Sequence, residues 1–104
     1  MPSTLKIGGH DFSIVSGGEV DKELEGNGNA GSCSTSRKRI SLKSTLLPQA
    51  FSEIFIHEVL HAIGGVFGNY TITEDEFHGL ANGLLQVLEQ LDIRFVLGDG
   101  GTHD

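Results

Sequence analysis

The segment 54–63, near the middle of the chain, constrains the fold more than any other. Its only polar side chains are His57, Glu58 and His61, which spell the motif H-E-x-x-H, and every other side chain is apolar. A helix that is apolar nearly all round belongs in a protein interior. Polar groups left there without partners would cost roughly 2–7 kcal/mol each. The segment therefore predicts a buried helix whose three polar side chains share a ligand.

The spacing of the two histidines indicates that this ligand is a metal ion. Positions i and i+4 lie on one face of a helix, so both imidazoles can point at one cation. Zinc lowers the pKa of a bound water to about 7, and a glutamate between the histidines is placed to accept its proton. The sequence predicts Zn2+ as cofactor, His57 and His61 as ligands and Glu58 as general base. Core histidines that bind no metal are the alternative interpretation.

A catalytic zinc site usually has a third protein ligand. The longer motif H-E-x-x-H-x-x-G-x-x-H would require a histidine at position 67, where this chain has phenylalanine. The third ligand must then follow later in the chain, and the candidates in the stretch 71–78 are Glu74, Glu76 and His78.

This stretch opens a second predicted helix. Either Thr71 with Glu74 or Thr73 with Glu76 forms a capping box at its start. Apolar residues then recur at helical spacing, at Phe77, Leu80, Ala81, Leu84, Leu85, Leu88 and Leu91. At 100° per residue, Glu74 lies roughly 60° from the centre of that apolar face.

The two alternative ligands, Glu76 and His78, each lie roughly 100° from that centre, on opposite flanks. Glu74 is therefore the acid best placed to face the first helix. His78 has a second possible role, because a histidine one turn after Glu74 can orient a ligand imidazole by hydrogen bonding.

Two segments, IHEVLHAI at 56–63 and TEDEFHGLANGLLQVL at 73–88, resemble the minigluzincins. These are very small gluzincin-type zinc metallopeptidases, with related phage and prophage proteins. The family pairs an H-E-x-x-H helix with a "glutamate helix" whose first-turn glutamate is the third zinc ligand. The resemblance covers residues from about 46 to 91. It implies zinc ligands at His57, His61 and Glu74, with Glu58 as general base, although His78 stands where the family often has an acid.

The N-terminal half predicts strands. The alternation at 4–7, the Gly8-Gly9 turn and the apolar run 12–15 indicate a hairpin, and the alternation at 39–43 predicts a third strand. We expect a small α+β fold, with a sheet of about three strands packed on the H-E-x-x-H helix and the glutamate helix.

The segment 16–36 is rich in Gly, Asn and Ser and predicts a mobile loop. It contains a G-x-G-x-x-G match at 26–31. That match opens no helix and lacks the βαβ context of a dinucleotide site, so we do not expect nucleotide binding.

Length and composition suit one domain, residues 1–104, with strands and a loop in 1–45, the helical zinc-binding half in 46–97 and a tail in 98–104. The absence of a signal-like N-terminus and of an apolar run near 18 residues favours a cytoplasmic protein of phage or bacterial type, with no membrane partner. The single cysteine suits a reducing compartment. The net charge of −7 (7 basic, 14 acidic residues) argues against nucleic-acid binding.

The expected activity is hydrolysis of a peptide or protein substrate, with Tyr70 as a possible transition-state donor. The strand at 39–43 is a candidate to bind an extended peptide, provided that it lies at a sheet edge. The alternative is a weakly active or inactive interaction protein with a zincin fold and a structural zinc.

Overall fold

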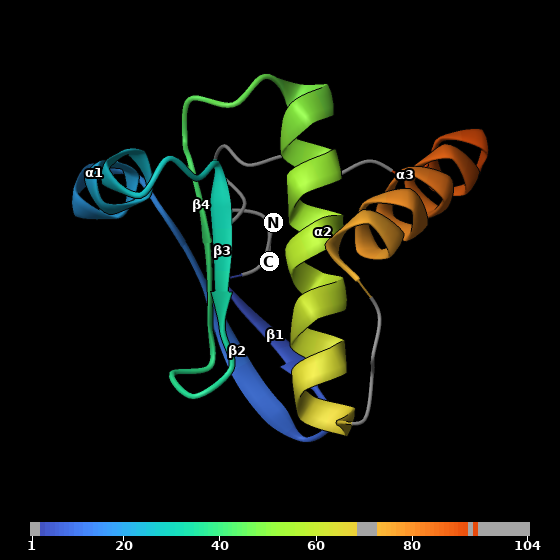
Figure 1. Ribbon diagram of the computed structural model, residues 1–104, viewed down its shortest axis with the longest axis horizontal. Helices are drawn as coiled ribbons and strands as arrows, with labels where there is room; N and C mark the ends of the chain where they lie inside the picture. The colour runs from blue at the N-terminus through green and yellow to red at the C-terminus, as the bar shows by residue number, and fades with distance from the viewer. Residues whose placement is uncertain (1–2, 69–72, 92, 94–104) are drawn as a thin grey trace.

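The computed structural model describes residues 3–68, 73–91 and 93 and has an α+β fold, as the sequence predicts. Its elements stack in layers, which Figure 1 shows from one side. Helix α1 (Gly18–Gly26) lies on one side of a mixed sheet, helix α2 (Pro48–Phe67) covers the other side, and helix α3 (Glu74–Gln90) packs on the outside of α2. The sheet contains four strands, one more than expected, and α1 is a further helix.

The first two strands form the predicted hairpin. Strands β1 (Thr4–Ile7) and β2 (His10–Ser16) pair antiparallel, with Ile7 opposite His10. The turn between them uses Gly8 and Gly9 at φ angles of 56° and 85°. Such left-handed angles are open to glycine at little cost, which is why this dipeptide marks the turn in the sequence.

The predicted third strand, β4 (Arg39–Leu42), lies inside the sheet rather than at its edge. The strand order is β1-β2-β4-β3, so β4 pairs in parallel with β2 and antiparallel with β3 (Gly31–Ser34). Its main-chain groups are therefore used on both sides. The hypothesis that this strand adds an extended peptide is wrong. Among the residues that the structure describes, the free edge next to it belongs to β3.

The prediction of one mobile loop over 16–36 is also wrong, because this segment forms α1 and β3. Helix α1 buries only Leu24, so it has no apolar stripe that sequence periodicity could detect. Strand β3 reads Gly-Ser-Cys-Ser and contains no strong β-former. Its conformation comes from pairing with β4, a tertiary contact rather than a local preference.

The main core lies between the sheet and α2. Phe12, Ile40 and Leu42 are fully buried, and Phe51 and Phe55 of α2 pack on them with their rings parallel, 6.2 Å apart. Ile40 and Leu42 of β4 both face this core because every second side chain of a strand points to the same side of the sheet.

Helix α2 begins with Pro48 in its first turn, and the Gly64-Gly65 pair lies inside the helix. It continues to Phe67, and Gly68 closes it at φ 68° by donating its N–H to the Gly64 carbonyl. By length and composition α2 is apolar enough to cross a membrane. In this fold it packs against the sheet on one side and α3 on the other, and this contact explains its apolar composition.

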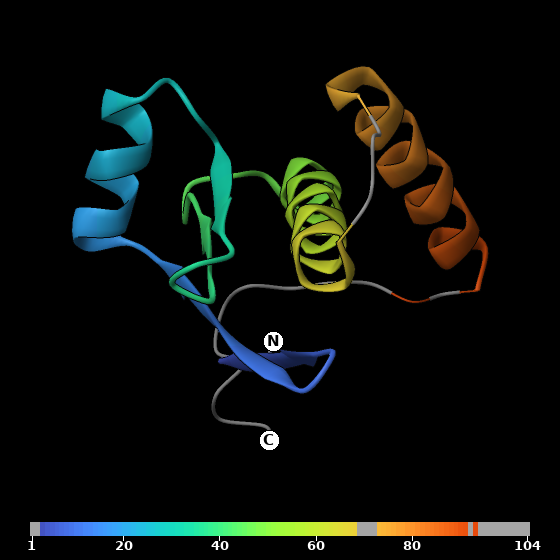
Figure 2. The ribbon, with the colours of Figure 1, turned by 60° about the horizontal axis from the view of Figure 1, so that its bottom comes forward.

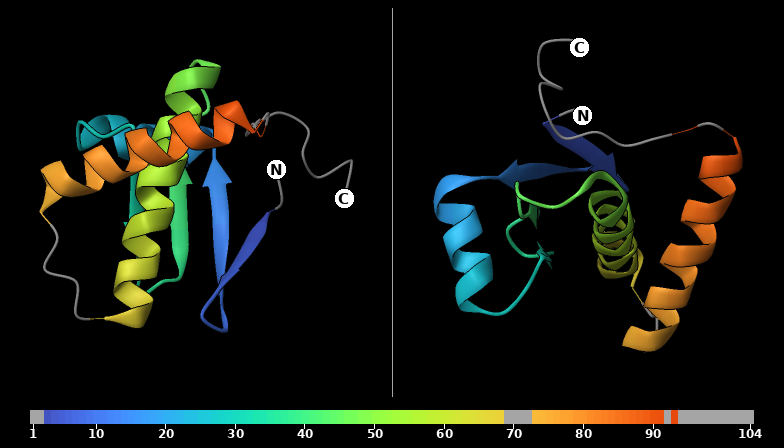
Figure 3. Two further views of the ribbon diagram at one scale, coloured as in Figure 1. Left: turned by 90° about the vertical axis from the view of Figure 1, so that its right-hand side faces the viewer. Right: turned by 90° about the horizontal axis from the view of Figure 1, so that it is seen from above.

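Helix α3 crosses α2, as the left view of Figure 3 shows, and α2 lies between α3 and the sheet in Figure 2. A second, smaller cluster joins them, in which Ile56 of α2 is buried with Ala81 and Leu85 of α3. A neighbouring flank of α3 leaves an apolar stripe exposed, made of Leu80, Leu84 and Val87, with Leu91 directly after the helix.

Replacing Gly83 with alanine should stabilise the protein by about 0.5–1 kcal/mol. Gly83 lies inside α3, and a Cβ there would meet no atom within 4 Å, so the substitution removes only the conformational cost of glycine. Urea unfolding measures the gain. Gly28→Ala is the matched control: Gly28 adopts φ 71°, and alanine there should destabilise the fold.

Candidate metal centre

Helix α2 lies between helix α3 and strand β3, and its polar side chains emerge between these two elements. Ile56 packs against α3, whereas Glu58 lies close to Gly31 of β3. His57 stands between these two positions in the sequence, and each step turns the helix by about 100°. The imidazoles of His57 and His61 therefore emerge on the strip of α2 between its sheet-facing and its α3-facing sides.

Helix α3 supplies the acid that meets them. Thr73 caps the helix: its hydroxyl accepts the Glu76 N–H at 3.2 Å, and the Glu76 carboxylate accepts the Thr73 N–H at 2.8 Å. Of the two predicted capping boxes this is the Thr73–Glu76 one. It occupies Glu76, which is therefore not a third metal ligand in this arrangement, and leaves Glu74 in the first turn to face α2.

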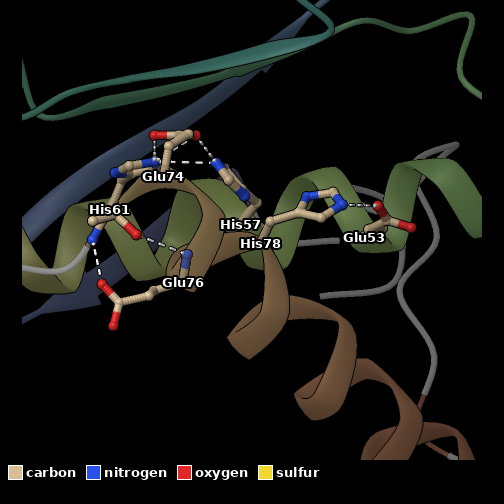
Figure 4. A network of polar contacts seen from close by, with 7 residues as sticks. Glu53, His57, His61, Glu74, Glu76 and His78 are labelled. Atoms are coloured by element: carbon tan, nitrogen blue, oxygen red, sulfur yellow. Dashed lines mark hydrogen bonds and ion pairs between the residues drawn. The ribbon is translucent and has the colours of Figure 1, made fainter.

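The structure brings together His57, His61 and Glu74, as Figure 4 shows. The Nε2 atoms of the two histidines lie 3.1 Å apart. Oε1 of Glu74 is 2.6 Å from Nε2 of His57, and both carboxylate oxygens are 3.4 Å from Nε2 of His61. Among the residues that the structure describes, this is the one group of three or more His, Cys, Asp or Glu side chains with metal-binding geometry.

These distances fit a tetrahedral metal ion. Zinc binds nitrogen and oxygen at about 2.0–2.2 Å, which separates neighbouring tetrahedral ligands by roughly 3.3 Å. The spacings of 3.1 and 3.4 Å match that edge, whereas the 2.6 Å contact between His57 and Glu74 would lengthen on binding. Two imidazoles and one carboxylate leave a fourth position open, as catalytic zinc sites do.

The acid of this group favours a bound cation. The hydrogen bond with His57 is the main cause that lowers the pKa of Glu74, and its contacts with His61 add to it. Glu74 is consequently ionised at neutral pH. Partial desolvation opposes this shift in the pKa of Glu74, but the contacts with the two imidazoles outweigh it.

Glu58 has the opposite environment. It is only 8% exposed, between α2 and β3, and this burial raises its pKa. The nearby imidazoles of His57 and His61 oppose the shift, whereas the charge of Glu74 adds to it. A carboxylate with a raised pKa is a stronger base than an exposed one, which suits proton transfer near neutral pH.

This burial predicts a pH-dependent stability for the metal-free protein. Since the pKa of Glu58 is raised on folding, protonated Glu58 stabilises the fold below its ordinary pKa of 4.5, and this contribution is lost as pH rises through the raised value. Glu58→Gln should therefore be more stable than wild type at neutral pH, with the gap closing on acidification. Urea unfolding of chelator-treated protein between pH 4 and 8 tests this, and a gap that does not vary with pH would contradict it.

His78 lies beside the group but outside it. Its Nε2 faces Glu53 of α2 at 3.7 Å, and its ring stands edge-on to that of His57 at 6.1 Å between centroids (Figure 4). The alternative that His78 is the third ligand is therefore not supported by this arrangement. Sequence analysis did not identify Glu53 as its partner. Tyr70, the candidate transition-state donor, lies outside the described residues.

Replacing Thr73 with alanine should cost about 1 kcal/mol of stability, because it removes the side chain that caps α3. It should also weaken metal binding, since Glu74 follows in the same helical turn. Urea unfolding and zinc titration measure the two effects. Thr45→Ala, at an exposed threonine before α2, is the control and should leave both unchanged.

Comparison of the chain with protein-family models, with curated proteins and with solved structures gives no match. The resemblance to the minigluzincins thus stays a hypothesis based on the residues of α2 and α3.

Proposed function

We propose that this protein is a zinc-dependent peptidase of the gluzincin type. The observation that carries the proposal is the convergence of His57, His61 and Glu74, with a buried glutamate, Glu58, between the two histidines in the sequence. A structural zinc site would need no such base, and four protein ligands would normally close it.

The residues of this chain divide the chemistry between them. A bound zinc ion would act as Lewis acid on a peptide carbonyl and lower the pKa of water to about 7. Glu58 takes the proton of the attacking water and delivers it to the leaving amine. Glu74 and the two imidazoles would hold the cation.

The free edge of β3 supports a peptide as substrate. Lys43 donates its N–H to the Ala30 carbonyl at 3.0 Å, so the pair 30–43 is hydrogen-bonded. Bonded and non-bonded pairs alternate along an antiparallel ladder. The main-chain groups of Gly31 and Cys33, in the next non-bonded pairs, therefore point away from β4. They are available to pair with an extended peptide next to Glu58.

Digestion of an unbiased peptide library by zinc-loaded protein tests the proposal. We expect cleavage at preferred sites, loss of cleavage with a chelator and recovery on addition of zinc. Protein that holds one zinc ion per chain and cleaves no peptide would contradict it.

The second candidate function is a non-enzymatic interaction protein with a structural zinc. The exposed apolar stripe of α3, made of Leu80, Leu84 and Val87 with Leu91 directly after the helix, favours it, because such a helix flank commonly meets a partner. Under this alternative a biological effect of the protein would survive loss of Glu58.

A further inference from the structure

Gly31 of β3 occupies a position where no side chain fits. A Cβ at this residue would stand 2.6 Å from Cγ2 of Ile54, 3.2 Å from the Ser41 carbonyl oxygen and 3.3 Å from Cγ of Glu58. Real Cβ atoms essentially never approach another atom to 2.6 Å, so the Ile54 side chain, the strand or the helix would have to move. The backbone of Gly31 requires no left-handed angle, and the constraint is one of space alone.

The neighbours of Gly31 are the parts of the proposed site. Ile54 and Glu58 belong to α2 and are one helical turn apart, on the side that faces β3. Ser41 belongs to β4, to which β3 is paired. Gly31 also offers its own N–H and C=O at the free edge, so it lies between the general base and the place where an extended peptide would pair.

A second glycine, Gly65 of α2, lies where the chain just after β3 approaches the same helix. A Cβ on Gly65 of α2 would stand 2.6 Å from Oγ1 of Thr35, just after β3. Strand and helix thus approach closely at two places, one with the glycine on the strand and one with it on the helix. The two contacts involve Ile54 and Gly65 of α2, and both histidines lie between these two residues in the helix. Strand β3 therefore runs alongside the part of α2 that carries His57 and His61.

We propose that Gly31 is a positioning residue that sets the distance between the free edge of β3 and the metal-binding face of α2. The proposal rests on the proposed function and deepens it. A side chain at 31 would push the edge strand away from α2, so that a peptide paired to β3 no longer places its scissile carbonyl beside Glu58. The metal ligands come from α2 and α3, and this displacement would leave them in place.

Two hydroxamates separate these effects in zinc-loaded protein. Acetohydroxamate needs only the metal, whereas a peptidyl hydroxamate needs the metal and the strand edge. We expect Gly31→Ala to weaken the peptidyl compound at least tenfold and to leave zinc and acetohydroxamate affinity within about twofold of wild type. Gly83→Ala, an alanine added in open space, is the matched control and should change none of them.

The variant Gly31→Ala/Ile54→Ala provides a rescue, because it removes the methyl group nearest to the new Cβ. Peptidyl hydroxamate affinity should recover at least in part, even if the single variant folds poorly. Equal affinity of wild type and Gly31→Ala for the peptidyl compound would overturn the proposal, as would equal weakening of both hydroxamates or a double variant no better than the single one.

These outcomes are separate from failure of the proposed function. A wild-type protein that cleaves no peptide but gives the expected hydroxamate pattern would contradict peptidase activity and support the role of Gly31. A wild-type protein that cleaves peptides, with Gly31→Ala equal in its kcat and KM, would support the activity and contradict the positioning role.

Discussion

Glu58→Gln should lower kcat for peptide hydrolysis by about 10²–10⁴-fold, the usual contribution of a general acid–base. The amide keeps the shape of the carboxylate but cannot accept the proton of water at neutral pH. KM should change little, because Glu58 is buried against β3 and is not one of the three groups that bind the metal. Steady-state kinetics with a cleaved library peptide, together with zinc analysis, measures both quantities.

Glu89→Gln is the matched control for this exchange. Glu89 is an exposed acid near the end of α3, far along the helix from Glu74, and its loss removes the same charge. It should leave kcat unchanged. If Glu58→Gln retained full activity, Glu58 would not be the base. If a biological effect of the protein survived while hydrolysis was lost, the interaction function would gain support.

The second large effect concerns the metal. His57→Ala and Glu74→Gln should each weaken zinc binding by well over about 100-fold, because loss of a partner that merely orients a ligand already costs about 10–100-fold. At a zinc concentration 100 times its Kd, binding stabilises the wild type by about 2.7 kcal/mol. For a domain of this size that corresponds to roughly 10–20 °C in Tm, which the variants should lose.

Thermal unfolding with and without zinc, and chelator competition, measure these losses. Asp75→Asn is the control for Glu74→Gln, since it changes the neighbouring exposed acid, and His10→Ala is the control for the histidine. Both should bind zinc as the wild type does. A wild-type Tm that does not respond to zinc would contradict the metal centre, and so would a Glu74 variant with unchanged affinity.

The capping box shows how two levels of structure combine at this centre. Thr73 and Glu76 satisfy each other's N–H groups, and this fixes where α3 begins. Ile56, Ala81 and Leu85 then fix how α3 lies on α2. Glu74 meets the histidines only because both conditions hold.

Much of this centre was predictable from the sequence. The spacing of His57 and His61 on a helix is a local property, since i and i+4 share a face whatever the rest of the chain does. The amphipathic pattern of α3 placed Glu74 nearer to α2 than Glu76 or His78, and the structure brings Glu74 to the histidines. The hairpin turn at Gly8-Gly9 was equally local.

The edge of the sheet was not predictable. Strand β3 has no β-forming residues, and α1 has one buried side chain, so neither left a periodic signal. The order β1-β2-β4-β3 depends on which strands pair, and the alternation within β4 is the same whether it lies inside the sheet or at its edge. The steric demand at Gly31 comes from residues 10 or more positions away, which only the fold brings near.

The sequence by itself thus determined the two long helices α2 and α3, the histidine pair and the acid that faces it, because these follow from backbone periodicity and hydrogen bonding over a few residues. The tertiary structure decided which strand is free, where Glu58 is buried and why Gly31 has no side chain. Those features depend on how segments distant in the chain pack against one another. Close packing depends on which side chains meet in the folded protein, and no local sequence pattern encodes that.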